Sequence, residues 1–136
     1  MKITPTLFLA AMALSTGACA TMPSASSPAL AGTEWRFTAI DGAAPAVPDR
    51  AELRFEADRM GANVGCNGMG GDWRLDGSTL ITGPLISTQM YCEGPVWDQE
   101  RAVSALLAGK PEVQRAGDRL VLTGAGHRAE LVLAGE

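Results

Sequence analysis

The stretch NVGCNGMGGDW, residues 63–73, packs four glycines and a cysteine into eleven residues before a tryptophan. A phosphate-binding glycine loop needs a strand before it, a helix after it and a nearby lysine or hydroxyl group. Here the glycines lead into DWRLDG, which alternates like a strand, and no lysine is near. We therefore expect a glycine-rich bend between two strands, with Asn67 bonding the backbone of its own loop.

Most of the chain on either side of this stretch alternates between apolar and polar side chains. In TEWRFTA, Trp35 and Phe37 point one way, and in AELRFE, Leu53 and Phe55 do the same. This period of two is typical of half-buried antiparallel strands. The pattern predicts a β-rich α+β domain, built as a curved antiparallel sheet or a partly closed barrel. Further strands are predicted at residues 59–64, 72–77, 79–81, 85–91, 113–115, 120–123 and 129–133.

One segment, PVWDQERAVSALLAGKP at residues 95–111, has the period of a helix and predicts a single packed helix at about residues 96–108. Pro95 suits the first turn, where its missing N–H is not needed. Asp98 and Glu100 lie early in the helix, where we expect them to complement the positive end of its dipole. An apolar stripe should face the sheet, formed by Val96, Val103, Leu106 and Leu107.

The N-terminus has the pattern of an export signal: a lysine at position 2, an apolar run at residues 7–14 and small residues after it. The run TGAC resembles a bacterial lipobox, in which Cys19 becomes the lipid-bearing first residue after a signal peptide of residues 1–18. The alternative is ordinary cleavage after Ala20, at an A-x-A pattern, which would leave a soluble protein.

The segment after the signal is small, polar and proline-containing over residues 19–31, as in a flexible tether. The folded domain is therefore predicted at residues 32–136.

The balance of charge argues against binding to nucleic acid. The chain has 11 basic and 15 acidic residues, a net charge of −4, and the basic residues are scattered along it. Binding through counterion release requires a clustered positive face. We expect membrane contact only through the N-terminal lipid.

Two cysteines remain after Cys19, namely Cys66 and Cys92. An even pair in an exported chain is a candidate disulfide. For a closed loop of about 27 residues, the chain-entropy estimate of its stabilisation is roughly 3.5 kcal/mol.

A reactive thiol at Cys66 is the alternative, and it would need a base or a positive neighbour. The one histidine, His127, lies far along the chain, and no C-x-x-C motif is present. Two cysteines and one histidine also lack the spacing of a zinc site. We predict neither a metal nor a cofactor.

Acidic pairs and tryptophans are the remaining candidates for a site. The tryptophans are expected mainly in the core, because each buries a large apolar area, although they could instead line a ligand groove. The acidic pairs are expected on solvated faces. The pairs are Glu93 with Asp98 and Asp72 with Asp76, and the tryptophans are Trp35, Trp73 and Trp97.

The order of these motifs resembles the META domain of HslJ-like bacterial envelope proteins. The resemblance rests on a G-C-N motif followed by a glycine and an aromatic residue, then on a T-x-M-x-C segment within GPLISTQMYC, and then on the helix. It covers essentially everything after the tether. The matching residues are Trp35, Gly65, Cys66, Asn67, Gly71, Thr88, Met90 and Cys92, and Trp73 stands at the aromatic position, where the family usually has tyrosine.

The resemblance implies a small envelope protein linked to heat shock and other stress, and in some bacteria to novobiocin resistance. It supplies no catalytic residues, and it implies that the matching residues form a structural core. We therefore predict a non-enzymatic, monomeric lipoprotein that acts in stress or antibiotic tolerance or as an interaction module for an envelope protein or a small molecule. Because Ala20 follows the lipid-bearing cysteine in place of aspartate, we expect the outer membrane, facing the periplasm.

Two other functions stay open. One is a periplasmic ligand-binding or enzyme-inhibiting module, and the other is a hydrolase of unknown type.

Overall fold

The computed structural model describes residues 27–135, so the predicted signal peptide and the lipidation of Cys19 lie outside the described residues. Over this part the chain forms nine strands, one α-helix and one short 3-10 helix. In chain order they are β1 (Thr33–Ile40), η1 (Pro48–Arg50), β2 (Glu52–Phe55), β3 (Arg59–Asn63), β4 (Gly68–Asp76), β5 (Thr79–Thr82), β6 (Ile86–Ser87), α1 (Pro95–Ala108), β7 (Glu112–Ala116), β8 (Arg119–Gly124) and β9 (His127–Gly135).

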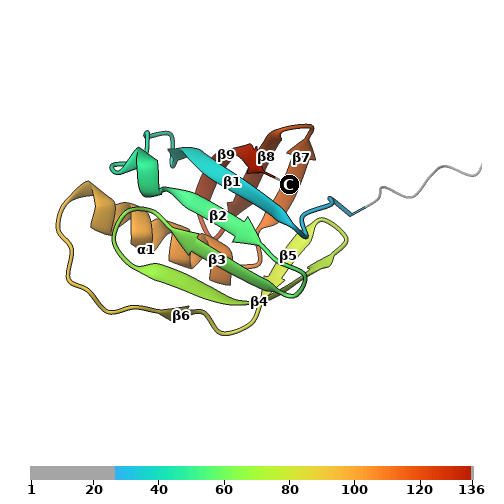
Figure 1. Ribbon diagram of the computed structural model, residues 1–136, viewed down its shortest axis with the longest axis horizontal. Coiled ribbons are helices and arrows are strands. Elements are labelled where there is room, and N and C mark those ends of the chain that lie inside the picture. The colour runs from blue at the N-terminus through green and yellow to red at the C-terminus, as the bar shows by residue number, and fades with distance from the viewer. Residues whose placement is uncertain (1–26, 136) are drawn as a thin grey trace, which may run out of the picture.

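The strands form a closed antiparallel barrel, with β6 attached to β4 outside the ring (Figure 1). The order around the ring is β3-β2-β1-β9-β8-β7-β5-β4, and the pairing of β3 with β4 completes it. The narrowest junction joins β5 to β7 through the pair Thr79 and Glu112. There, the Leu80 N–H donates to the Pro111 carbonyl at 2.9 Å. The predicted curved sheet or partly closed barrel is confirmed.

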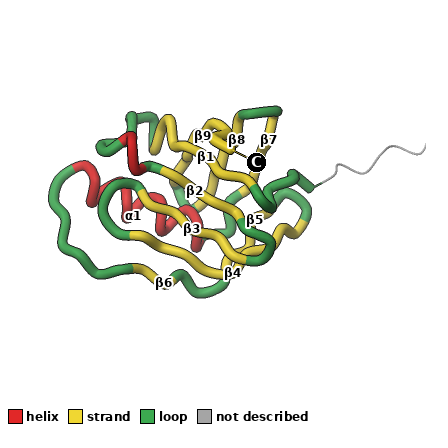
Figure 2. The backbone as a smooth tube through the Cα atoms, viewed as in Figure 1, coloured by secondary structure: helices red, strands yellow, loops and turns green. Residues whose placement is uncertain are grey.

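The core lies inside the barrel, and the alternation seen in the sequence produces it. Trp35 and Phe37 of β1 and Leu53 and Phe55 of β2 are buried, whereas the neighbouring Arg36 is exposed. Helix α1, drawn in red in Figure 2, adds apolar side chains to the same core cluster. The predicted helix is confirmed. Its core side chains are Ala102, Val103, Leu106 and Leu107.

The structure differs from the prediction at residues 85–91, where a full strand was expected. Only β6 forms a ladder there, and residues 88–94 continue without strand pairing until α1 begins. The physical reason is that the side chain of Asn67 forms hydrogen bonds with the backbone N–H and carbonyl of Met90, which a neighbouring strand would otherwise bond.

The glycines were also expected in the bend, but Gly68, Gly70 and Gly71 lie within β4. Two of them permit a close backbone approach. A Cβ on Gly70 would lie 2.7 Å from the Met60 carbonyl oxygen, and one on Gly71 would lie 2.9 Å from that of Pro84. A larger side chain would push apart the segments that pack against β4.

The packed domain begins before the predicted boundary at residue 32. Leu30 is buried in the core cluster, and its carbonyl accepts a hydrogen bond from the Thr33 hydroxyl. Within residues 27–135, no helix is both long enough and apolar enough to cross a membrane.

Candidate binding site beside the Cys66–Cys92 bridge

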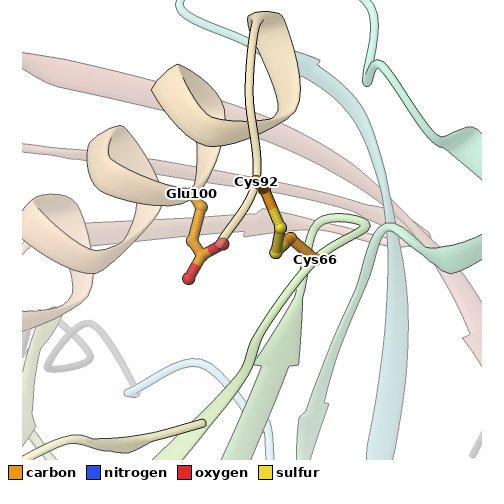
Figure 3. Close-up of side chains that lie close together, drawn as sticks. All are labelled: Cys66, Cys92 and Glu100. Carbon is orange, nitrogen blue, oxygen red and sulfur yellow. A yellow bond between two sulfur atoms is a disulfide. The ribbon is translucent and has the colours of Figure 1, made fainter. Parts of the chain in front are cut away.

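A disulfide between Cys66 and Cys92 joins the β3–β4 connection to the segment before α1 (Figure 3). The two Cα atoms lie 6.4 Å apart, and the predicted bridge is confirmed. Residues 83–94, which connect β5 to α1 and include β6, are called the strap below. The bridge ties the strap to the barrel near the start of α1. Cys66 is therefore not a free thiol in this structure.

Asn67 holds the strap next to the bridge. Its side chain is buried, its Nδ2 group donates to the Met90 carbonyl at 3.0 Å, and its Oδ1 accepts from the Met90 N–H at 2.7 Å and from the Thr88 hydroxyl at 2.8 Å. Asn67 was expected to bond its own loop, and that expectation is wrong. The residue that does so is Asn63, whose Oδ1 accepts from the Gly65 N–H at 2.7 Å.

The G-C-N and T-x-M-x-C motifs therefore bind each other. Cys66 bonds to Cys92, and Asn67 bonds to Thr88 and Met90. The cysteine count predicted the bridge, but the sequence did not predict the bonds of Asn67 to Thr88 and Met90, because they depend on how the closed barrel brings two distant segments together.

The other motif residues support the fold. Trp35 is buried, and its indole N–H donates to the Thr33 hydroxyl at 2.7 Å. Trp73 is half-buried and packs edge-on against Phe55, with ring centroids 4.9 Å apart. Gly65 has a φ of 129°, a conformation that favours glycine, and a Cβ there would lie 2.7 Å from Val47.

The strap carries the large apolar side chains that are exposed. Ile86 is 75% exposed, Met90 53% and Tyr91 82%, and among residues 27–135 these three are the exposed large hydrophobic residues. The Met90 backbone is clamped by Asn67 while its side chain reaches solvent. The strap is thus fixed in position and presents three large apolar side chains to solvent.

A pocket of about 440 Å³ opens between the strap and α1. Trp97 lies on its α1 side, and the ring of Tyr91 stands 6.4 Å from that of Trp97, tilted by 46°. A second hollow of about 390 Å³ continues along α1 and shares Ser87, Trp97, Glu100 and Ser104 with the first. The first pocket is lined by Asn67, Ser87, Thr88, Gln89, Met90, Tyr91, Trp97, Glu100 and Ser104.

The three tryptophans do not gather into one groove. Trp35 lies in the core and Trp73 lies against Phe55, so only Trp97 lines this pocket.

Glu100 lines the same pocket and is 7% exposed. One carboxylate oxygen accepts from the Asn67 N–H at 3.3 Å. A carboxylate oxygen of Glu100 and the two bridge sulfurs lie within 4.8 Å of one another, and Figure 3 shows the side chain reaching from α1 toward the bridge. Asp98 and Glu100 were expected to complement the positive end of the helix dipole, but only Asp98 lies in the first turn, and Glu100 is buried one turn further along.

Sequence periodicity contained a signal for this burial. Val96, Glu100, Val103 and Leu107 follow one another at spacings of four, three and four, so Glu100 occupies an apolar position of the helix stripe. Gln99 beside it is also buried, and its side chain bonds the Ala44 carbonyl and the Ala46 N–H.

Cys66, Cys92 and Glu100 are the one group within residues 27–135 whose ligand atoms are close enough to hold a metal ion. Thiolates are the sulfur species that bind metals, and the bridge leaves neither sulfur as a thiolate. A metal site here would therefore require prior reduction.

His127 lies away from the cysteines. Its Nδ1 is 2.7 Å from an oxygen of Asp41, and the other Asp41 oxygen accepts from the Arg128 N–H at 2.9 Å. These two hydrogen bonds lower the pKa of the Asp41 carboxyl, and the bond from the Arg128 backbone has the larger effect.

The acidic residues considered as pairs in the sequence have other partners. Asp72 forms an ion pair with Arg59 at 3.0 Å, and Glu93 accepts a hydrogen bond from the Tyr91 hydroxyl at 3.2 Å.

Comparison with known proteins gives one family and two structures. The model of a family described as META domain matches residues 28–136. An NMR structure of a protein from Burkholderia xenovorans is similar at 27% identity with a TM-score of 0.62, covering 79% of this chain and 85% of that one. A second NMR structure, at 21% identity with a TM-score of 0.67, covers 78% of this chain and 92% of that chain and shares the fold. No curated protein matches the chain.

Proposed function

The chain belongs to the META domain family, and from that premise we propose that it is a non-enzymatic cell-envelope lipoprotein that works as an interaction module. The observation that carries the proposal is the strap, whose Ile86, Met90 and Tyr91 side chains stand exposed on a segment fixed to the barrel. Exposed apolar patches mark interaction sites on soluble domains. A segment already held in place loses little conformational freedom on binding, which favours affinity.

The proposed location follows from the N-terminus and the bridge. A disulfide is typical of an oxidising compartment outside the cytoplasm. Lipid on Cys19 would anchor a monomeric domain to the outer membrane, facing the periplasm, with the alternative of a soluble periplasmic protein cleaved after Ala20. The family resemblance links such a protein to stress or antibiotic tolerance.

The mass of the mature N-terminus tests the anchor. A diacyl or triacyl mass on Cys19 is the expected result. An unmodified chain beginning at residue 21 would contradict the lipid anchor and leave the interaction module to be tested separately.

Affinity capture tests the interaction module. The tagged full-length chain is recovered from detergent-treated envelopes beside a variant with Ile86→Ser, Met90→Ser and Tyr91→Ser. The matched control carries Thr38→Ser and Thr123→Ser, two exposed positions of the barrel wall. We expect one envelope protein to be recovered with wild type and control, lost with the strap variant, and to rebind when purified. Equal recovery with all three chains would contradict the proposal.

A second candidate function, a periplasmic ligand-binding or enzyme-inhibiting module, is favoured by the pocket itself. Its volume of about 440 Å³ lies in the usual range of ligand sites. A small molecule recovered with the purified chain and absent from a Trp97→Leu variant would support this function.

A further inference from the structure

The buried carboxylate of Glu100 needs a physical explanation. It occupies an apolar position of the α1 stripe, is 7% exposed, and accepts one 3.3 Å hydrogen bond from a neutral backbone N–H. Glutamate is rarely so buried unless it is paired, because desolvation of a charge is costly. Within residues 27–135, Glu100 forms no ion pair.

The cation nearest in sequence does not supply the missing charge. Arg101 follows Glu100 directly on α1, and adjacent helical residues do not face each other. Arg101 is exposed and lines the second hollow along α1, which Glu100 also lines, but no ion pair joins the two side chains. The 440 Å³ pocket has no basic residue in its lining, so a positive group that meets Glu100 from this side would come from another molecule.

The walls of the pocket also suit a cation. Trp97 and Tyr91 line the pocket, and the centroids of their rings lie 6.4 Å apart. Aromatic faces attract ammonium and guanidinium groups, most strongly where water is partly excluded. The Tyr91 hydroxyl donates to Glu93, which is a second carboxylate in contact with this wall of the pocket. Ser104 and Gln89 add hydrogen-bond acceptors to the lining.

The surroundings indicate that the cation belongs to a polypeptide. Met90 and Tyr91 line the pocket, and Ile86 is exposed on the same strap. A free amine would leave these apolar side chains uncovered. A protein segment could place a basic side chain in the pocket and cover the strap with its apolar neighbours. The chain's net charge of −4 complements a basic partner.

We infer that the pocket between the strap and α1 binds a lysine or arginine side chain of a partner polypeptide, with Glu100 as the counter-ion and Trp97 and Tyr91 as aromatic walls. This inference rests on the proposed function, because it names the partner chemistry of the same surface.

Defined probes test it on the full-length chain purified from envelopes in detergent. The probes are five-residue peptides with a central lysine, arginine or uncharged norleucine between leucines, and butylammonium as a free amine. Binding is followed by the NMR resonance of the Trp97 indole N–H, assigned from its loss in Trp97→Phe. We expect the lysine and arginine peptides to bind about tenfold more tightly than the norleucine peptide, and less tightly at high salt.

The decisive variant is Glu100→Gln, which keeps the size of the side chain and its acceptor for the Asn67 N–H. We expect it to remove the preference for charged peptides, whereas Asp98→Asn, which neutralises the exposed carboxylate of the first turn, keeps it. If Glu100→Gln fails to fold, Trp97→Leu tests the aromatic wall, with an expected loss of binding to both charged peptides.

Three results would overturn the inference. They are equal binding of lysine and norleucine peptides, an unchanged preference in Glu100→Gln, and butylammonium binding as tightly as the lysine peptide, which would indicate a free amine as the ligand. Failure here is distinct from failure of the proposed function. If the strap variant loses its partner while Glu100→Gln keeps it at full affinity, the interaction module stands and the cation pocket is wrong.

Discussion

The barrel wall and the strap are held in place by different kinds of contact. The wall consists of continuous antiparallel ladders around a buried apolar core. The strap has a two-residue ladder at β6, and beyond it depends on the bridge and on the side chain of Asn67. The wall therefore draws its stability from many similar contacts, whereas the strap depends on a few specific ones. The strap is also where the exposed apolar side chains and the pocket lie.

Removing a large side chain from the wall should have the largest effect. Trp35 is fully buried, so Trp35→Ala leaves a cavity and removes the indole N–H that donates to the Thr33 hydroxyl. We expect a loss of about 3–5 kcal/mol in the free energy of unfolding, measured by urea denaturation. Trp73→Ala is the matched control, and its half-buried ring should cost clearly less. Equal losses would contradict the view that the core inside the ring dominates stability.

Removing the bridge should come next. The double variant Cys66→Ser, Cys92→Ser is expected to lose roughly 3.5 kcal/mol in the free energy of unfolding, because the unfolded chain gains freedom. Native-state hydrogen exchange should speed up most at residues 88–94, and the amides of β1 and β9 should stay protected. Cys19→Ser, which keeps the bridge, is the control. Uniform loss of protection in both regions would show that the strap and the wall open together.

The wall could be predicted from the sequence, and the reason is physical. Each strand of the wall buries every second side chain, as Trp35 and Phe37 show in β1 and Leu53 and Phe55 in β2. The alternation within one strand is therefore enough to predict the strand and its buried face. The helix followed from its own period in the same way. The Cys66–Cys92 pairing could be predicted too, because it needed only a count of cysteines in an exported chain.

The strap could not be predicted in this way, because its contacts join distant segments. Residues 85–91 have strand-like composition, but the Asn67 side chain bonds the N–H and carbonyl of Met90, which a neighbouring strand would otherwise have bonded. The Glu100 position was visible in the helix period, yet a carboxylate near a helix start also fits the dipole. Only the closed barrel, which brings α1 against the G-C-N motif, distinguishes these two roles.

Breaking the Asn67 clamp should cost less than breaking the bridge but still a measurable amount. Asn67→Ala removes the two bonds that a buried side chain makes to the partly buried N–H and carbonyl of Met90, and the bond from the Thr88 hydroxyl. We expect a loss of about 2–3 kcal/mol in the free energy of unfolding, together with faster exchange of the Met90 amide. Asn63→Ala removes a single bond in a partly exposed loop and should cost about 1 kcal/mol. If both variants cost the same, the clamp is not what holds the strap.

The smallest effect on stability should come from Asp41. Like Asn67 in the strap, Asp41 in the wall accepts a hydrogen bond from a backbone N–H through its side chain. Its carboxylate accepts the Arg128 N–H beyond the end of β1, and so stands in for a strand neighbour, but it does so in solvent. The fold lowers the Asp41 pKa, chiefly through this backbone bond and then through His127. The stabilisation is therefore present above the unfolded pKa of about 4 and is lost as the pH falls through the folded value.

Asp41→Asn should lower the melting temperature slightly at pH 7, and the difference from wild type should shrink toward pH 2. Asn tolerates the positive φ of 50° at this position, so backbone strain does not confuse the result. Asp118→Asn, which removes another exposed carboxylate, is the matched control. Because Asp41 and Asn67 both accept a backbone N–H, a cost at Asp41 as large as that at Asn67 would contradict burial of the side chain as the reason why the Asn67 bonds stabilise more.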